Sequence, residues 1–485
     1  MRFTSRILSS VTSVVAVAAG VTGFVVPASA STASGSATWG KAQQVVTPVT
    51  RAKSYGGITS VSCAAGGYCA AVSYYQTVAE KWAPYVATGK NGRWSKIALF
   101  NLSALKQGVQ PSPQSGLVSC PSAGNCVAVG TYQNRDNGTT LFYVNEKNGT
   151  WGKAEPIDGV AFGWLDPPFR LACSSAGNCV IGGEYTVFDE SESTMQPFVA
   201  TERNGVWGAS EDLPGTASLP NILQGTVSSI SCTAGNGCLA VGSYVTGIEG
   251  EATQNHWFAS TEKNGTWGAA QAIPDLPANA SISLAACSPD GSCTITGEFY
   301  AGAERGQLFT ILRKNGTWGA INDLHGMQAL NGYLVSLACP TRGYCTAAGS
   351  YDNAADRLQS FVAVERNGYW HKAVNLPGIA KLNHGKGYAA VIASLSCPNE
   401  YNCAVTGWAN VYVSATVVRT EAFVANEING VWHWAEVIPN ITKLDGTGDS
   451  QAVSVSCSSP NNCAAAGFYT KTSSTSPEAF VAWQS

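Results

Sequence analysis

The chain has 485 residues, of which 12% are charged and 45% hydrophobic, and its formal net charge is -3. With a pI near 6.0 it lacks the basic surface that nucleic acids and anionic lipids attract, so we expect neither as a partner. Its 52 glycines and the absence of long amphipathic helical patterns predict an all-β protein of strands and tight turns.

The N-terminal segment, residues 1–30, has the organisation of a secretory signal peptide. Arg2 and Arg6 precede an apolar stretch, and Ala28 and Ala30 form a small-residue cleavage site. A membrane anchor is the alternative, but a polar stretch without a charge cluster follows, and no later segment has the roughly 18 apolar residues that a membrane helix needs. We therefore expect cleavage near Ala30 and secretion into an oxidising, extracellular compartment.

Internal repetition is the strongest feature of the remaining sequence. Sixteen cysteines form eight pairs, each with five residues between its members, and the first members recur every 52 to 60 residues. That period is typical of a propeller blade of four strands. The pairs are Cys63 and Cys69, Cys120 and Cys126, Cys173 and Cys179, Cys232 and Cys238, Cys287 and Cys293, Cys339 and Cys345, Cys397 and Cys403, and Cys457 and Cys463.

Each repeat unit is predicted to contain four antiparallel strands. The first strand ends at the first cysteine and the second begins at the second cysteine, as in residues 126–132, with apolar alternation. After a variable loop comes the third strand, for example residues 198–202, and then an Asn-Gly turn at Asn204 and Gly205. Asn-Gly suits a two-residue hairpin because both residues tolerate a positive φ. The fourth strand opens with a tryptophan such as Trp207.

The order of the tryptophans predicts a closed ring. One tryptophan precedes the first cysteine pair and none follows the last, so the fourth strand of the last unit is expected to come from the N-terminus. Open ends would leave exposed edge strands. We therefore predict that residues 31–485 form a single eight-bladed β-propeller, monomeric, closed by its N-terminal strand. The eight tryptophans are Trp39, Trp94, Trp151, Trp207, Trp267, Trp318, Trp370 and Trp432.

Disulfide bonds within each pair are the expected state of the cysteines, because a hairpin turn places the two side chains opposite each other. Zinc is the alternative, but zinc sites usually combine a C-x2-C or C-x4-C pair with a second ligand pair. We therefore expect no metal and no cofactor. A glutamate before the Asn-Gly turn also recurs, and it is interpreted as scaffold; it occurs as Glu146, Glu202, Glu262, Glu365 and Glu427.

The turn and the tryptophan that follows it, as in Asn264, Gly265 and Trp267, resemble the Asp-box (BNR) repeat of sialidase-type propellers. The chain also resembles secreted actinobacterial propeller proteins with paired cysteines. It departs from the Asp-box in having two rather than three steps from Gly to Trp. Sialidases carry an arginine triad, and here only residues 169–171 are similar to one of their arginine segments. The resemblance implies a propeller fold without establishing a sialidase.

The connections that vary between units should share one face, and loops of variable content on a rigid scaffold commonly bind ligands. The third unit departs most from the repeat there. Arg170 replaces a serine that stands three residues before the first cysteine in five units, and Trp164 and Asp166 precede it. Glu184 follows in the next hairpin. A salt bridge of Arg170 with Asp166 is the alternative to ligand contact.

Extra tryptophans outside the repeated position are further binding candidates, with core packing as the alternative: Trp82, Trp257 and Trp408. Glu184 and Glu298 occupy the same position of the repeat in units that lie two apart. They are interpreted as solvated rim charges rather than a glycosidase pair. No catalytic residue is identified. The sequence therefore favours a binding module for a glycan or an extracellular protein. The alternatives are a carbohydrate-active enzyme, either a sialidase-like glycoside hydrolase or a polysaccharide lyase, and a structural or inhibitory role in the cell envelope.

Overall fold

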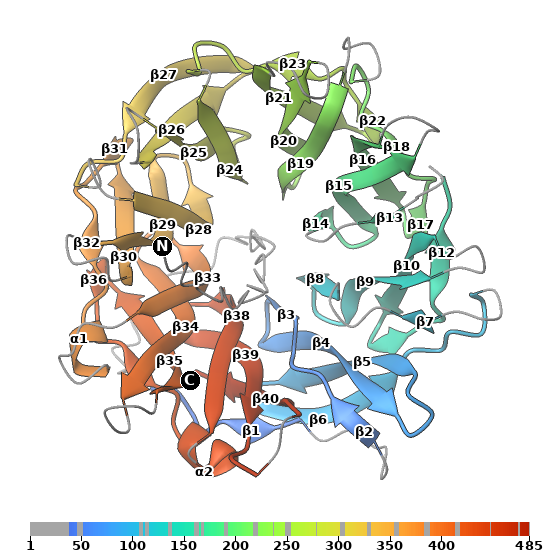
Figure 1. Ribbon diagram of the computed structural model, residues 1–485, viewed down its shortest axis with the longest axis vertical. Coiled ribbons are helices and arrows are strands. Elements are labelled where there is room, and N and C mark those ends of the chain that lie inside the picture. Colours follow the sequence, from blue (N-terminus) through green and yellow to red (C-terminus); the bar gives the residue numbers. More distant parts are fainter. Residues whose placement is uncertain are drawn as a thin grey trace, which may run out of the picture.

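Figure 1 shows the computed structural model of the chain, with repeated antiparallel sheets arranged side by side around a centre. The structure describes residues 38–45, 52–105, 110–111, 116–133, 138–159, 164–165, 169–188, 193–216, 222–235, 237–247, 254–277, 279–300, 306–326, 331–353, 358–382, 389–412, 418–446, 448–473 and 476–484. The expected signal peptide (1–30) and Asp166 lie outside these ranges. The described chain is an all-β, propeller-like fold, as the sequence predicts.

We number the repeat units 1 to 8 by their cysteine pairs. Units 1 to 3 contain β2 (Ala52–Tyr55), β3 (Ser60–Ala64), β4 (Tyr68–Thr77), β5 (Trp82–Lys90) and β6 (Arg93–Leu99); β7 (Gln110–Pro111), β8 (Leu117–Ser122), β9 (Asn125–Gln133), β10 (Thr139–Lys147), β11 (Thr150–Trp151) and β12 (Glu155–Ile157); and β13 (Trp164–Leu165), β14 (Arg170–Ser175), β15 (Asn178–Phe188), β16 (Ser193–Arg203), β17 (Val206–Trp207) and β18 (Glu211–Asp212).

Units 4 to 6 contain β19 (Ile222–Thr233), β20 (Gly237–Thr246), β21 (Gln254–Lys263), β22 (Thr266–Trp267) and β23 (Gln271–Ala272); β24 (Ala280–Cys287), β25 (Cys293–Tyr300), β26 (Gly306–Lys314) and β27 (Thr317–Asp323); and β28 (Asn331–Thr341), β29 (Tyr344–Asp352), β30 (Leu358–Arg366), β31 (Tyr369–Trp370) and β32 (Val374–Asn375). A parallel pairing of Met195 with Gln224 joins units 3 and 4 into one 11-stranded sheet.

Units 7 and 8 contain β33 (Ala390–Asn399), β34 (Asn402–Tyr412), β35 (Val418–Ile428), β36 (Val431–Trp432) and β37 (Glu436–Val437); and β38 (Asp449–Ser459), β39 (Asn462–Thr470), β40 (Glu478–Trp483) and, from the N-terminus, β1 (Gln43–Gln44). Two short helices, α1 (Ile379–Leu382) and α2 (Ile441–Asp445), precede the first strands of these two units. Ile379 and Ile441 anchor them in the core.

The N-terminal strand pairs with the C-terminal strand. Gln43 lies opposite Val481 in the antiparallel pair of β1 with β40, and Trp39 forms a bridge with Gln484. The indole Nε1 of Trp39 also donates to Asn426 of unit 7 at 3.2 Å, and in unit 4 Trp267 donates in the same way to Thr201 of unit 3 at 3.0 Å. Trp39 therefore serves as the fourth-strand tryptophan of unit 8, and the predicted pairing of the two ends is confirmed.

An aromatic residue of the third strand packs over a glycine of the second strand in most units. Phe258 lies opposite Gly242 in the ladder, and a Cβ on that glycine would lie 2.6 Å from the phenyl ring and 1.9 Å from the Thr226 carbonyl oxygen. Only glycine gives the ring room at this place. Phe309 over Gly297 repeats the arrangement in unit 5. This pair explains the Gly that the sequence repeats inside the second strand.

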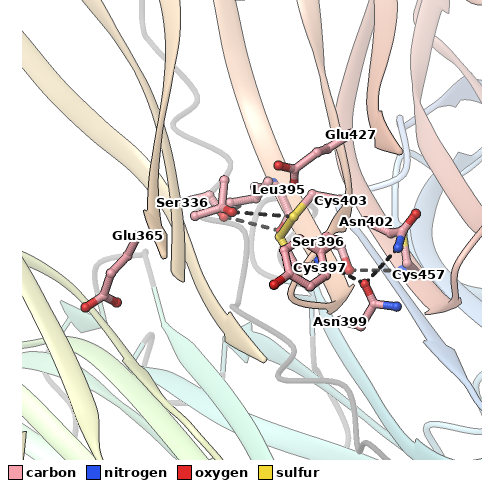
Figure 2. The surroundings of a disulfide bond; sticks show 12 residues. Ser336, Glu365, Leu395, Ser396, Cys397, Asn399, Asn402, Cys403, Glu427 and Cys457 are labelled. Carbon is pink, nitrogen blue, oxygen red and sulfur yellow. Dashed lines mark hydrogen bonds between the residues drawn. A yellow bond between two sulfur atoms is a disulfide. The ribbon is translucent and has the colours of Figure 1, made fainter. Parts of the chain in front are cut away.

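Serines of the innermost strands join neighbouring units. The hydroxyl of Ser336 accepts the backbone N–H of Leu395 at 3.3 Å, and that of Ser396 accepts the N–H of Cys457 at 3.0 Å (Figure 2). Equivalent bonds cross from unit 1 to 2, 4 to 5, 6 to 7, 7 to 8 and 8 to 1. Because the first strand has no strand partner on that side, the hydroxyl satisfies a buried donor that would otherwise remain unpaired.

All eight disulfides form within their own units, with Cα–Cα distances of 3.9 to 4.1 Å, and no cysteine is free. The predicted pairing is therefore confirmed. A full set of disulfides is typical of a protein exported to an oxidising compartment. In the part of the chain that the structure describes, no helix has the length and apolar character needed to cross a membrane.

Candidate functional site

Arg170 begins β14, where five other units carry the serine that joins neighbouring units. Its Nε donates to the backbone carbonyl of Ser228 in unit 4 at 2.5 Å, and its Nη1 donates to the carbonyl of Phe169 at 3.3 Å. Burial lowers the pKa of Arg170 to about 10, an effect that the nearby Glu184 carboxylate opposes. Arg170 thus bridges unit 3 to unit 4 by a different chemistry from serine.

The structure brings three of the four predicted residues of unit 3 to one end of β15. Glu184 lies on β15, half-buried and within electrostatic reach of Arg170. The backbone of Trp164 on β13 pairs with Thr186, two residues from Glu184. Asp166, the fourth residue, lies outside the described residues. The alternative of a salt bridge between Arg170 and Asp166 therefore stays a prediction.

The extra tryptophans lie in three different units. Trp257 on β21 is 6% exposed and packs in a core cluster with Val241 and Ile282. Trp82 begins β5 and Trp408 lies on β34, and both are half-buried. Of the three, Trp82 and Trp408 are therefore partly exposed.

The interpretation of Glu184 and Glu298 as solvated rim charges stays a prediction. Both side chains are half-buried, and burial raises the pKa of Glu298, whose carboxylate accepts a hydrogen bond from Ser281 at 3.4 Å. The two residues lie on β15 of unit 3 and β25 of unit 5, so they do not form a pair across one cleft. The sequence shows that the two residues share one position of the repeat, but it does not show how far neighbouring side chains bury them.

The opposite face, which we call the turn face, carries the cysteine loops and the Asn-Gly turns. These two constant connections bond directly to each other: the N–H of Gly149 donates to the Gly124 carbonyl at 2.8 Å, and that of Gly205 to the Gly177 carbonyl at 2.9 Å. The constant connections of these units therefore share one face. The bonds hold the turn face in one conformation, which is what a preformed binding surface needs.

Two adjoining cavities open between units on the turn face. The cavity between units 2 and 3 has a volume of about 370 Å³, and the cavity between units 3 and 4 has a volume of about 460 Å³. Both volumes fall in the range of small-molecule sites. Their linings share Cys179, Glu202 and Asn204 of unit 3. The remaining polar lining includes carboxylates, amides and ammonium groups from the adjacent units.

Glu202 is central to this pair of cavities. It is 2% exposed, its Oε1 accepts a hydrogen bond from the Asn145 amide of unit 2 at 2.6 Å, and its Oε2 has no hydrogen-bond partner within the described chain. Burial raises the pKa of Glu202, while Asn145 and the Lys147 ammonium group lower it. An oxygen of this kind is ready to accept a hydrogen bond from a ligand hydroxyl or amine.

The other glutamates of the repeat are buried in the same way, between 2% and 7% exposed. In unit 7, Glu427 accepts a hydrogen bond from Arg366 of unit 6 at 2.5 Å, and the Arg366 guanidinium lies 5.3 Å from the Tyr401 ring centroid. Figure 2 places Glu427 beside the disulfide of its unit. Arg366, the residue after Glu365, thus reaches the glutamate of the next unit, and Lys147, the residue after Glu146, lies near Glu202 in the same way.

Sequence reasoning directed attention to the variable face and missed these gaps. The available signal was the repeated Glu-Lys or Glu-Arg pair before Asn-Gly, which was interpreted as scaffold because it recurs. What the pattern does not reveal is that the charged pair of one unit faces the carboxylate of the next. Among the described residues, no group of three or more His, Cys, Asp or Glu side chains is placed to hold a metal ion.

No protein-family model and no curated protein matches the sequence. Solved structures with a similar fold include a protein of unknown function from Dyadobacter fermentans, with a TM-score of 0.41 and 10% identity over 92% of this chain and 98% of that one. An ulvan lyase of polysaccharide lyase family PL25 gives a TM-score of 0.44 and 10% identity over 84% of this chain and 100% of that one.

The Hadza microbial sialidase Hz136 is also similar, with a TM-score of 0.35 and 13% identity over 75% of this chain and 77% of that one. These values concern the fold alone. The residues of the chain therefore have to carry any argument about its activity.

Proposed function

We propose that residues 31–485 form a single eight-bladed β-propeller, secreted after cleavage near Ala30, that acts as a monomeric binding module for glycans. The pairing of β1 with β40 supports closure of the ring. The first strands also contact one another in sequence from β3 to β38, and β38 contacts β3. The bonds from Ser454 and Ser456 to the backbone of unit 1 hold that last junction.

The observation that carries the binding function is the pair of adjoining cavities that share Glu202 on the turn face. Sugar rings offer closely spaced hydroxyls that donate and accept hydrogen bonds. The cavities offer a buried, partly unpaired carboxylate at Glu202, a side-chain amide at Asn145 and an ammonium group at Lys147. Their volumes and rigid walls favour a preformed site for one or two sugar units in each gap.

Catalysis receives less support from the geometry. Hydrolysis of a glycosidic bond generally needs two carboxyl groups on either side of the bond, and Glu184 and Glu298 lie in different units. Arg170, the residue most similar to the arginine segments of sialidases, donates to two backbone carbonyls within the scaffold. A sialidase-like hydrolase or a lyase is therefore the alternative, and its support is the electrostatic influence of Glu184 on Arg170.

A glycan array combined with a panel of fluorogenic glycosides tests the class of function. The proposal expects saturable binding to a limited set of glycans and no release of fluorophore above that of a buffer blank. Turnover of any glycoside, lost in Arg170→Ala or Glu184→Gln, would establish the enzyme instead. An array without a bound glycan contradicts the proposal directly.

The variable face supplies a second place where a glycan could bind, at Arg170, Glu184 and Trp164. Arg170→Ala and Trp164→Ala should each weaken binding by about 1 to 3 kcal/mol if this face is used. Should both variants bind an array-identified glycan like wild type, the remaining candidates on that side are Trp82 and Trp408. Trp257→Phe serves as the control, because its side chain is in the core.

A further inference from the structure

Three gaps of the turn face follow a charge rule. In unit 6, Arg366 extends to Glu427 of unit 7, and in unit 2, Lys147 lies near enough to Glu202 of unit 3 to lower its pKa. Arg203 of unit 3 lies over the turn of unit 4, where a Cβ on Gly265 would meet its Nε. A cation of one unit thus faces the carboxylate position of the next.

The gap between units 4 and 5 breaks this rule. Arg313 pairs with Cys293 across the strands, as Glu262 pairs with Cys238 and Glu427 with Cys403, so it occupies the carboxylate position of unit 5. In the preceding unit, Lys263 has the place of Lys147 and Arg366 in the repeat, but it lines the cavity between units 3 and 4.

Arg313 has no counter-charge within the described chain. Its Nε is buried without a hydrogen-bond partner, and no ion pair connects it to another described residue. The face of Trp318 supports its guanidinium at 5.5 Å from the ring centroid. Asp290, the carboxylate in the cysteine loop of the same unit, is engaged by Arg342 at 3.5 Å and by Ser292.

Room for a ligand exists above this turn. A Cβ on Gly316 would meet no atom within 4 Å, as also holds at Gly149 and Gly368, whereas side chains of the preceding unit cover Gly205 and Gly265. Lys263 and Lys314 are exposed, and the rest of the Arg313 side chain is half-buried. A guanidinium held on an aromatic face, without a counter-charge, has the chemistry that recognises planar or tetrahedral oxyanions.

We propose that Arg313, at the carboxylate position of unit 5, forms an oxyanion site that takes a carboxylate or sulfate group. Binding there supplies the negative charge that the glutamate provides in the other units and pairs a donor that is otherwise buried and unsatisfied. That the oxyanion belongs to an acidic glycan rests on the proposed glycan-binding function. The oxyanion site itself does not depend on it.

Titration with inorganic sulfate by calorimetry at constant ionic strength tests the site. Arg313→Gln removes the guanidinium, and we expect sulfate affinity to fall roughly 10- to 100-fold, as for the loss of a charge-assisted hydrogen bond. The matched control is Arg342→Gln, which makes the same change of charge at an exposed arginine one unit further on. It should leave the affinity for sulfate unchanged. Equal losses in both variants, or none in Arg313→Gln, would overturn the proposal.

Arg313→Glu provides a second test with a different readout. It restores the carboxylate that five other units carry at this position and removes the unpaired buried donor, so we expect it to abolish sulfate binding and to raise the melting temperature. A purely structural arginine predicts the reverse, a lower melting temperature, and that result contradicts the proposal.

Titration with a sulfated oligosaccharide and its desulfated form then addresses the source of the anion. Preference for the sulfated form, lost in Arg313→Gln, supports an acidic glycan as the ligand. Binding of inorganic sulfate without binding of either oligosaccharide leaves the oxyanion site established and counts against the glycan function alone.

Discussion

Removing the two serines that join unit 8 to unit 1 should destabilise the protein in a way that only a closed ring explains. Ser454 and Ser456 accept the backbone N–H groups of Val61 and Cys63 at 3.1 and 2.9 Å. Val61 and Cys63 are 2% and 3% exposed, so water does not replace the lost acceptors. Each unsatisfied donor costs about 1 to 3 kcal/mol, and the double alanine variant should lose about 2 to 6 kcal/mol of unfolding free energy.

Urea unfolding followed by tryptophan fluorescence measures this loss, and two further variants make it interpretable. The double variant of Ser394 and Ser396 removes the equivalent bonds between units 7 and 8, and a closed ring predicts a similar loss there. Ser458→Ala is the control, because its hydroxyl donates within unit 8 at 3.2 Å, and about 1 kcal/mol or less is expected. A loss at the junction of units 7 and 8, without one at units 8 and 1, would refute the closure.

Three other predictions follow from the same contacts. Deleting residues 31–46 of the mature chain removes β1 and Trp39, so the exposed edge of β40 should lower the melting temperature sharply or cause aggregation; an unchanged monomer indicates an open array. Burial raises the pKa of Glu365 above its ordinary value of 4.5, so its stabilising neutral form is fully populated below that pH and is lost as pH rises through the raised pKa. Glu365→Gln should therefore increase the urea midpoint at pH 7 and leave it unaltered at pH 4, and a decrease at pH 7 contradicts the assignment. Peptide mapping without reduction should recover Cys397 linked to Cys403 and no dominant bridge between units.

Much of the fold could be predicted from the sequence because the repeat makes each of its rules visible several times. The spacing of Cys63 and Cys69 gives the hairpin and its disulfide, and the early position of Trp39 gives the pairing of the two ends. The role of the repeated serines could not be predicted, because their partners are backbone N–H groups in another unit. Any residue type supplies such a donor, so the sequence does not mark it. Ser336 with Leu395 is an example.

The candidate site was harder to predict because its groups meet only across units. Nothing local to residues 200–205 indicates that Glu202 faces Asn145, 57 residues away. Arg313 could be found from the sequence, because unit 5 is the one unit with an Asn-Gly turn and an arginine in the place of the repeated glutamate. The sequence prediction considered only departures on the variable face. Burial of Trp257 likewise depends on neighbours such as Ile282 that come from the next unit.

The most direct measurement of the central claim is the affinity of an array-identified glycan for a variant that combines Asn145→Ala with Glu202→Gln. These residues line the cavity between units 2 and 3, and Glu202 also lines the next one. Glu365→Gln is the matched control, the same substitution at the equivalent glutamate outside both cavities. By calorimetry the account predicts at least about a tenfold loss of affinity for the double variant, with unchanged circular dichroism, and wild-type affinity for the control. Wild-type affinity in the folded double variant would contradict the account.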